Sequence, residues 1–173
     1  MKKLTCLKWN WLSLLSALLL AGGCASKGPG RATPFPITIE LDPGLKDKSM
    51  LVDLVGVNPA NEERWKSYSM SKYWRDGDPM RADAEKWTCN FISEPTQVKT
   101  LQLSDPIWKQ WPGAASVFVL ADLPGKHADM PGSQDSRRQL LPLSRSAWQK
   151  GTKELKVRIK ESGIEVVTPL RAQ

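Results

Sequence analysis

The chain has 173 residues, a formal net charge of +7 and a hydrophobic share of 40%. Its basic residues are spread along the sequence, whereas a nucleic-acid-binding protein concentrates them in a patch or stripe, so the charge pattern argues against a nucleic-acid partner. One histidine and three cysteines are too few for a metal site of clustered imidazoles and thiolates.

The N-terminus has the pattern of a secretory signal peptide. Lysines at positions 2, 3 and 8 precede an apolar stretch over residues 9–21, which is shorter than the roughly 20 apolar residues of a transmembrane helix. The Ala-Gly-Gly sequence before Cys24 resembles a bacterial lipobox, in which the cysteine thiol receives a diacylglyceryl group and the peptide is cut before it. We predict that residues 1–23 are removed and that Cys24 is lipidated. The alternative is an ordinary secreted protein whose Cys24 lies near the cut.

A lipid at Cys24 would decide the location of the protein. Each buried methylene contributes about 0.8 kcal/mol, so two or three acyl chains hold a protein at a membrane almost permanently. By resemblance to the bacterial sorting rule, Ala25 in place of Asp favours the outer membrane, with the domain facing the periplasm. We expect residues 24–34 to form a flexible tether, because they contain little that can pack, and residues 35–173 to form one domain.

Two strands are predicted at the start of this domain. Apolar residues alternate with other residues over positions 35–41, which is typical of a half-buried strand. Pro34 and Pro36 place this strand at the edge of a sheet or mark its beginning. An Asp-Pro-Gly turn and several charged residues follow, and a second strand is predicted over residues 50–57.

A helical region is predicted next. An Asn-Pro pair at positions 58 and 59 favours a helix start, and we predict the helix over residues 60–73. Trp74, which follows it, is expected to be partly exposed. Residues 75–83 are rich in Asp, Gly and Pro and predict a long surface loop.

The second half of the domain has mainly β character. Strands are expected over residues 86–92 and 96–103, and Val98, Leu101 and Leu103 are the candidates for inward-facing residues in the second of them. The remaining elements are a short helical turn at 105–111, an almost continuously apolar central strand at 116–123, and strands at 138–143, 155–160 and 163–168. Six or seven short strands with one or two short helices predict an antiparallel β-sandwich.

Catalysis finds little support in the residue pattern. His127 lies in a loop rich in Gly and Pro (residues 124–136) and is expected to be a solvated surface residue. A serine nucleophile would need a base, and the chain has neither a G-x-S-x-G turn nor a second histidine. A glycine-rich phosphate loop is also missing, and Cys89 is interpreted as a small buried hydrophobe. We therefore expect no enzyme, no cofactor and no metal.

The order of these elements resembles that of the type VI secretion lipoprotein family TssJ. The corresponding segments are residues 39–44 with 49–55, 65–74, 101–103, 111–113 and 117–121. The resemblance implies a lipidated cysteine followed by a transthyretin-like β-sandwich.

The same resemblance implies a structural role. A protein of that family tethers the periplasmic end of an inner-membrane secretion protein, TssM, to the outer membrane. The loop between the first two strands would bind this partner through Asp42, Lys46, Asp47 and Lys48, which are otherwise a solvated turn. Two other functions stay open: an envelope lipoprotein of another assembly, and a module that binds peptidoglycan or a small ligand.

Overall fold

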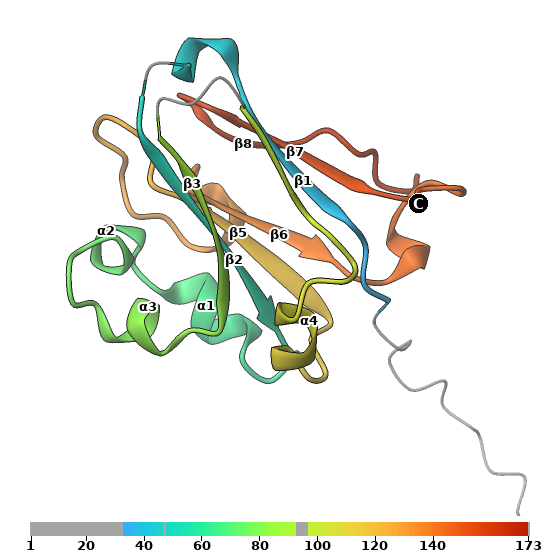
Figure 1. Ribbon diagram of the computed structural model, residues 1–173. Coiled ribbons are helices and arrows are strands. Elements are labelled where there is room, and N and C mark those ends of the chain that lie inside the picture. The colour runs from blue at the N-terminus through green and yellow to red at the C-terminus, as the bar shows by residue number, and fades with distance from the viewer. Residues whose placement is uncertain (1–32, 47, 93–96, 173) are drawn as a thin grey trace, which may run out of the picture. The chain divides into compact units, whose positions relative to one another are not determined.

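Eight strands form two four-stranded sheets in the described residues, which are 33–46, 48–92 and 97–172 of this computed structural model (Figure 1). The first sheet has the order β4 (Val98–Leu101), β1 (Ile37–Leu41), β7 (Leu155–Lys160) and β8 (Gly163–Val166). The second has the order β3 (Lys86–Phe91), β2 (Met50–Val57), β5 (Ser116–Ala121) and β6 (Arg138–Pro142). All neighbouring strands are antiparallel except β1 and β7, which run parallel. The predicted mainly β sandwich is confirmed.

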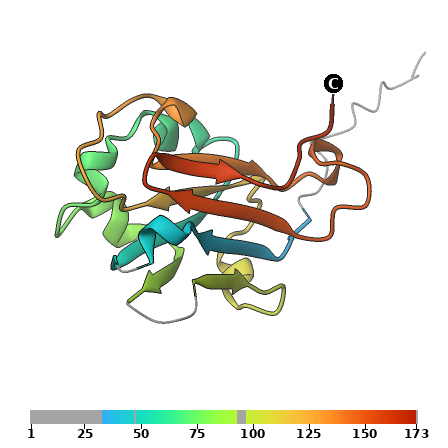
Figure 2. The same cartoon turned by 90° about the horizontal axis from the view of Figure 1, so that it is seen from above.

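β1 is the half-buried strand that its alternating sequence predicts. Ile37, Ile39 and Leu41 are buried in the core between the sheets, and the residues between them are partly exposed. β1 lies between β4 and β7 (Figure 2), so it is not an edge strand. The carbonyl of Pro36 accepts a hydrogen bond from the Leu155 N–H at 2.9 Å, and the prolines mark where the strand begins.

The prediction for β4 is only partly right. Leu101 is fully buried, but Val98 and Leu103 are 44% and 55% exposed. Side chains alternate between the two faces of a strand, so residues 98 and 101, three positions apart, cannot share a face. Leu103 lies beyond the end of β4, in a turn.

Three short helices cover the outer face of the second sheet (Figure 1). They are α1 (Glu62–Ser67), α2 (Met70–Tyr73) and α3 (Pro79–Asp83). Trp65, Met70 and Tyr73 pack there in one cluster with Phe118 and Leu120 of β5. Because β5 is covered on both faces, all of its residues are buried, as the continuous apolar run predicts.

The helix predicted over residues 60–73 is interrupted. Tyr68 has an extended ψ of 139° and ends α1. The Ser69 side chain accepts a hydrogen bond from the Lys72 N–H at 3.1 Å, so Ser69 caps a new helix, α2.

The loop predicted over residues 75–83 also contains a helix. Asp78 accepts a hydrogen bond from the Arg81 N–H at 2.9 Å, and Pro79 takes the first position of α3. The Arg81 guanidinium lies 4.5 Å from the centre of the Trp74 ring. Trp74 is half-buried, so its predicted partial exposure is confirmed.

A close contact joins β2 to the segment after α4 (Ile107–Gln110). A Cβ atom on Gly56 would lie 2.3 Å from the ring of Trp111, so this position of β2 requires a glycine for the indole to pack against the backbone. Cys89 of β3 lies in the same core, which confirms its predicted burial. Burial raises the pKa of the Cys89 thiol, which makes it a poor nucleophile.

Candidate functional site

The loop between β1 and β2 lies at one end of the sandwich, opposite the start of β1 (Figure 1). It contains a short 3-10 helix, η1 (Pro43–Leu45), in which Leu45 is fully buried. The Asp42 carboxylate accepts a hydrogen bond from the Gly44 N–H at 3.0 Å. Leu45 and Asp42 therefore fix the start of the loop, and the side chains of Lys46 and Lys48 are exposed.

The residues predicted to bind a partner occupy this loop. Lys46 is exposed, and it has no ion pair within the described part of the chain. Lys48 forms an ion pair with Glu161 in the turn between β7 and β8. Asp47 and the predicted lipidation site, Cys24, lie outside the described residues.

Other loops gather at the same end of the sandwich, which we call the loop end. The Asp42 N–H donates to the Ile159 carbonyl at 2.8 Å, and the Leu41 N–H donates to the Gln97 carbonyl at 2.9 Å. Ile92, which follows β3 here, is 55% exposed. The loop end is thus a charged surface with an exposed apolar side chain, and sequence reasoning missed the contributions of Ile92 and Glu161.

A buried charge cluster holds the helices to the second sheet. The Asp53 carboxylate of β2 has no exposed surface. It accepts hydrogen bonds from Tyr73 Oη at 3.0 Å, Arg81 Nε at 2.9 Å and Thr88 Oγ1 at 2.6 Å. Burial and the neighbouring Asp53 charge raise the pKa of Tyr73. The cluster is fully paired, so its geometry is that of a structural tie rather than a reactive site.

A second network fixes residues 122–136, the loop between β5 and β6. Arg137 donates to Asp135 and to Asp129 at 2.7 to 2.9 Å. Asp129 also accepts hydrogen bonds from Ser69 Oγ at 2.6 Å and from the Ser71 N–H at 2.9 Å. Burial alone would raise the pKa of Asp129, but these hydrogen bonds outweigh it and hold the pKa below its usual range.

His127 differs from its prediction. It is half-buried, and both ring nitrogens have partners, Ser136 Oγ and the Pro124 carbonyl, each at 3.1 Å. The solvated surface histidine predicted from the Gly- and Pro-rich composition is therefore wrong, because the loop folds back on itself. The Ser136 carbonyl accepts a hydrogen bond from the Ile164 N–H at 3.0 Å, which places this loop beside β8.

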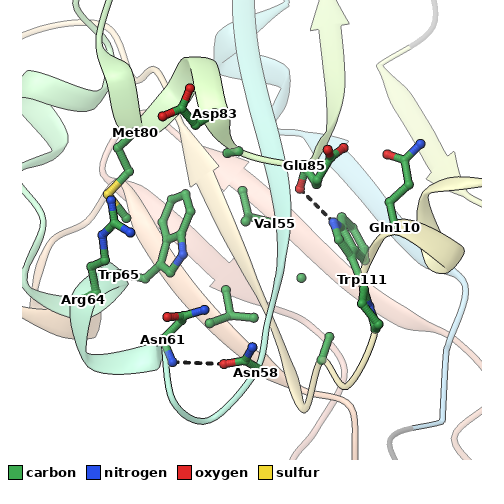
Figure 3. A pocket seen from close by; sticks show the side chains of 15 residues that line it. Val55, Asn58, Asn61, Arg64, Trp65, Met80, Asp83, Glu85, Gln110 and Trp111 are labelled. Atoms are coloured by element: carbon green, nitrogen blue, oxygen red, sulfur yellow. Dashed lines mark hydrogen bonds between the residues drawn. The ribbon is translucent and has the colours of Figure 1, made fainter.

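An open pocket of about 280 Å³ lies around the last residues of β2, between helices α1 and α3 and the segment that carries Trp111 (Figure 3). Trp65, Met80 and Trp111 form apolar walls, and Trp111 Nε1 donates to the Glu85 carbonyl at 2.7 Å. Its polar side chains do not form a nucleophile–base pair. Within the described residues, His, Cys, Asp and Glu form no group that could hold a metal ion, and none of the helices is long and apolar enough to cross a bilayer.

The sequence matches no family model and no curated protein. Solved structures do match the fold. The match with the C-terminal domain of the type VI secretion protein TssM from EAEC covers 78% of this chain and 100% of that domain, with 10% identity and a TM-score of 0.50. A chain from a type VI membrane complex covers 77% of this chain with 96% of its own, at 11% identity and a TM-score of 0.51. The type VI lipoprotein TssJ1 from Pseudomonas aeruginosa covers 82% with 99% of its own chain, at 11% identity and a TM-score of 0.47.

The resemblance to type VI secretion components is therefore confirmed at the level of the fold. One of these matching chains is described as part of a type VI membrane complex. At such identities the likeness is one of fold and does not extend to the residues of a site.

Proposed function

We propose that the protein is a lipid-anchored adaptor of a type VI secretion membrane complex. Cys24 would anchor it in the outer membrane, and the domain would face the periplasm. The loop end would bind the periplasmic domain of an inner-membrane protein of the TssM type, with Asp42, Lys46, Asp47 and Lys48 among the contacts. The protein would act by binding, without catalysis or a cofactor.

One geometric observation carries this proposal. The chain enters the sandwich at the start of β1, and the loop end follows directly after β1 (Figure 1). β1 has five residues, and a strand rises about 3.3 Å per residue, so the two attachment points lie at opposite ends of a rigid element about 17 Å long. An anchored domain built this way can present the loop end to a partner without bringing the partner onto the lipid.

The chemistry of the loop end suits a protein partner. Loops on a rigid sandwich can vary without disturbing the core, so partners commonly bind there. Lys46 is available for a new ion pair, and Ile92 offers exposed apolar area at the same end of the sandwich. Charged groups at the rim of an interface speed association and select the partner.

The test replaces Lys46, Asp47 and Lys48 with Gly and Ser and measures binding to the periplasmic domain of the TssM-type protein from the same genome. We expect most of the affinity to be lost, and we expect the loss to shrink as salt is raised, because exposed charges are screened. Circular dichroism and the melting temperature should stay nearly unchanged, since the exposed Lys48–Glu161 pair contributes at most about 1 kcal/mol.

A matched control removes charge at the other end of the sandwich. Replacing Lys150 and Lys153 with Ser should leave the affinity for the same partner domain unchanged. If the loop variant binds as well as the wild type, the interface lies instead at residues 75–83 or 124–136. Binding that survives the replacement of all three loops would contradict the adaptor proposal.

A further inference from the structure

A group of basic side chains lies at the end of the sandwich where the chain enters, which we call the tether end. Arg145, Lys150, Lys153 and Arg171 line a shallow hollow, and no acidic residue lines it. All four side chains are exposed, and none has an ion pair within residues 33–46, 48–92 and 97–172. We refer to these four residues as the basic surface.

The basic surface stands on a fixed scaffold. It includes the short 3-10 helix η3 (Arg145–Ala147), followed by Trp148, which is 1% exposed and donates from Nε1 to the Pro142 carbonyl at 2.8 Å. The Arg171 N–H donates to the Ala147 carbonyl at 2.9 Å, which holds the C-terminal segment beside η3. The charges therefore converge because the backbone places them together.

The position of the basic surface relative to the entering chain is equally defined. The Thr33 N–H donates to the Leu143 carbonyl at 3.2 Å, and the Arg145 guanidinium lies 4.9 Å from the centre of the Phe35 ring. β7 begins level with β1, because Leu155 is the register partner of Ile37. Residues 144–154 thus lie beside residues 33–37, where the described part of the domain begins (Figure 1).

The sequence limits how far this end can lie from the lipid. Nine residue steps separate Cys24 from Thr33, and an extended chain covers at most about 3.6 Å per residue, so Thr33 stays within about 32 Å of the anchor. Leu170, beside Arg171, is 59% exposed. Basic residues together with an exposed apolar side chain are typical of surfaces that bind the interface of anionic membranes.

We propose that the basic surface binds anionic lipid head groups of the membrane that holds the protein. The proposal rests on the lipid anchor at Cys24, and it adds a second contact that sets the orientation of the domain. With Arg145, Lys150, Lys153 and Arg171 on the lipid, the loop end points away from the membrane. Because acyl chains alone leave the domain free to turn, this contact would pre-orient it for a partner.

The experiment uses the processed, lipidated protein added to preformed vesicles of phosphatidylcholine, with or without phosphatidylglycerol. Lysine acetylation is followed by mass spectrometry, with Lys46 at the loop end as the internal reference. We expect Lys150 and Lys153 to react about fivefold more slowly on the anionic vesicles, because one basic residue near such a surface contributes about that factor. High salt should remove the protection, and Lys46 should react equally on both vesicles.

Two double variants separate the effect of these particular residues from the effect of the protein's net charge. Arg145→Gln with Arg171→Gln should lose most of the protection at Lys150 and Lys153. Arg75→Gln with Lys126→Gln, which removes the same charge elsewhere, should keep it. Equal acetylation of Lys150 on the two kinds of vesicle would overturn the proposal. Protection by inorganic phosphate without vesicles would also overturn it, because the surface would then be a site for free anions.

Flotation of the same samples keeps this proposal distinct from the anchor. The lipidated protein should float with pure phosphatidylcholine vesicles, and Cys24→Ser should abolish acylation and processing. If the wild-type protein fails to float with phosphatidylcholine, the anchor is wrong. Even if the anchor is wrong, slower acetylation of Lys150 on anionic vesicles would support lipid binding by the basic surface. Equal acetylation on both kinds of vesicle would overturn the lipid-binding proposal.

Discussion

The two sheets of the sandwich place similar charged pairs in different surroundings. On the second sheet, helices α1 to α3 cover the outer face, and the Asp53–Arg81 pair joins strand to helix at 2.9 Å with the carboxylate fully buried. On the first sheet the outer face is open to water. There Arg158 Nη2 lies 3.3 Å from Glu40 Oε2, and the two side chains are 37% and 42% exposed.

This difference decides what each pair contributes. An exposed ion pair contributes about 0–1 kcal/mol, because water screens the charges and side-chain entropy is lost. Removing one member of a buried pair costs about 3–5 kcal/mol, because the other charge stays buried without compensation. The helix layer is therefore joined to its sheet by a buried ion pair in which neither partner can be removed without a large loss of stability. The open face of the first sheet tolerates changes of charge.

The largest expected effect comes from a new charge under the helices. Leu120 of β5 is fully buried, whereas Val98 of β4 is 44% exposed. Leu120→Asp should prevent folding, because a buried unpaired carboxylate costs several kcal/mol and a whole domain is stable by only about 5–15 kcal/mol. Val98→Asp should change the stability by less than about 0.5 kcal/mol. Circular dichroism during thermal melting checks both, and a cooperative melt of Leu120→Asp would contradict the two-sided burial of β5.

A smaller effect is expected from removing the same residue type from each pair. Arg81→Met should lower the free energy of unfolding in urea by about 3–5 kcal/mol, because Asp53 then stays buried without its cation. Arg158→Met on the first sheet should lower it by at most about 1 kcal/mol. Equal losses in the two variants would mean that the helix layer opens to water, and the contrast between the sheets would then be wrong.

The strands were predictable because their signal is local. The alternation in β1 and the continuous apolar run in β5 each depend on residues within one strand, and the predicted bounds of β2 agree with the structure. The ends of the helices were harder to predict from the sequence, because Ser69 and Asp78 act as caps only in the right backbone conformation. Val98 was predicted to face inward with Leu101, but residues three positions apart on a strand lie on opposite faces.

The polar contacts were not predictable from the sequence. Asp53 lies 28 positions from Arg81, and Lys48 lies 113 positions from Glu161, so nothing local connects the members of either pair. The basic surface was missed for the same reason, because Arg145 and Arg171 meet only after the C-terminal segment folds back onto η3. A charged residue inside an apolar strand, as Asp53 is, was the one available signal that a buried partner had to exist.

The smallest expected effect tests the helix-side network through pH. The hydrogen bonds from Ser69, Ser71 and Arg137 hold the pKa of Asp129 below its usual range despite burial. A carboxyl group whose pKa is lower in the folded state than the unfolded value of about 3.9 stabilises the fold fully above that value, and loses this contribution as the pH falls. Asp129 is 39% exposed, so Asp129→Asn should cost only about 1 kcal/mol at pH 7.

The pH profile separates this charge effect from a loss of packing. In urea unfolding, the difference between wild type and Asp129→Asn should shrink steadily below about pH 5, because the unfolded wild-type chain then binds a proton at this carboxyl group, whereas the folded state binds it only at lower pH. Asp76→Asn is the matched control: Asp76 is exposed in the segment between α2 and α3, and its replacement should have little effect at any pH. A stability difference for Asp129→Asn that stays constant down to about pH 2 would mean that the side chain acts by shape, and that charge does not attach residues 122–136 to the helix layer.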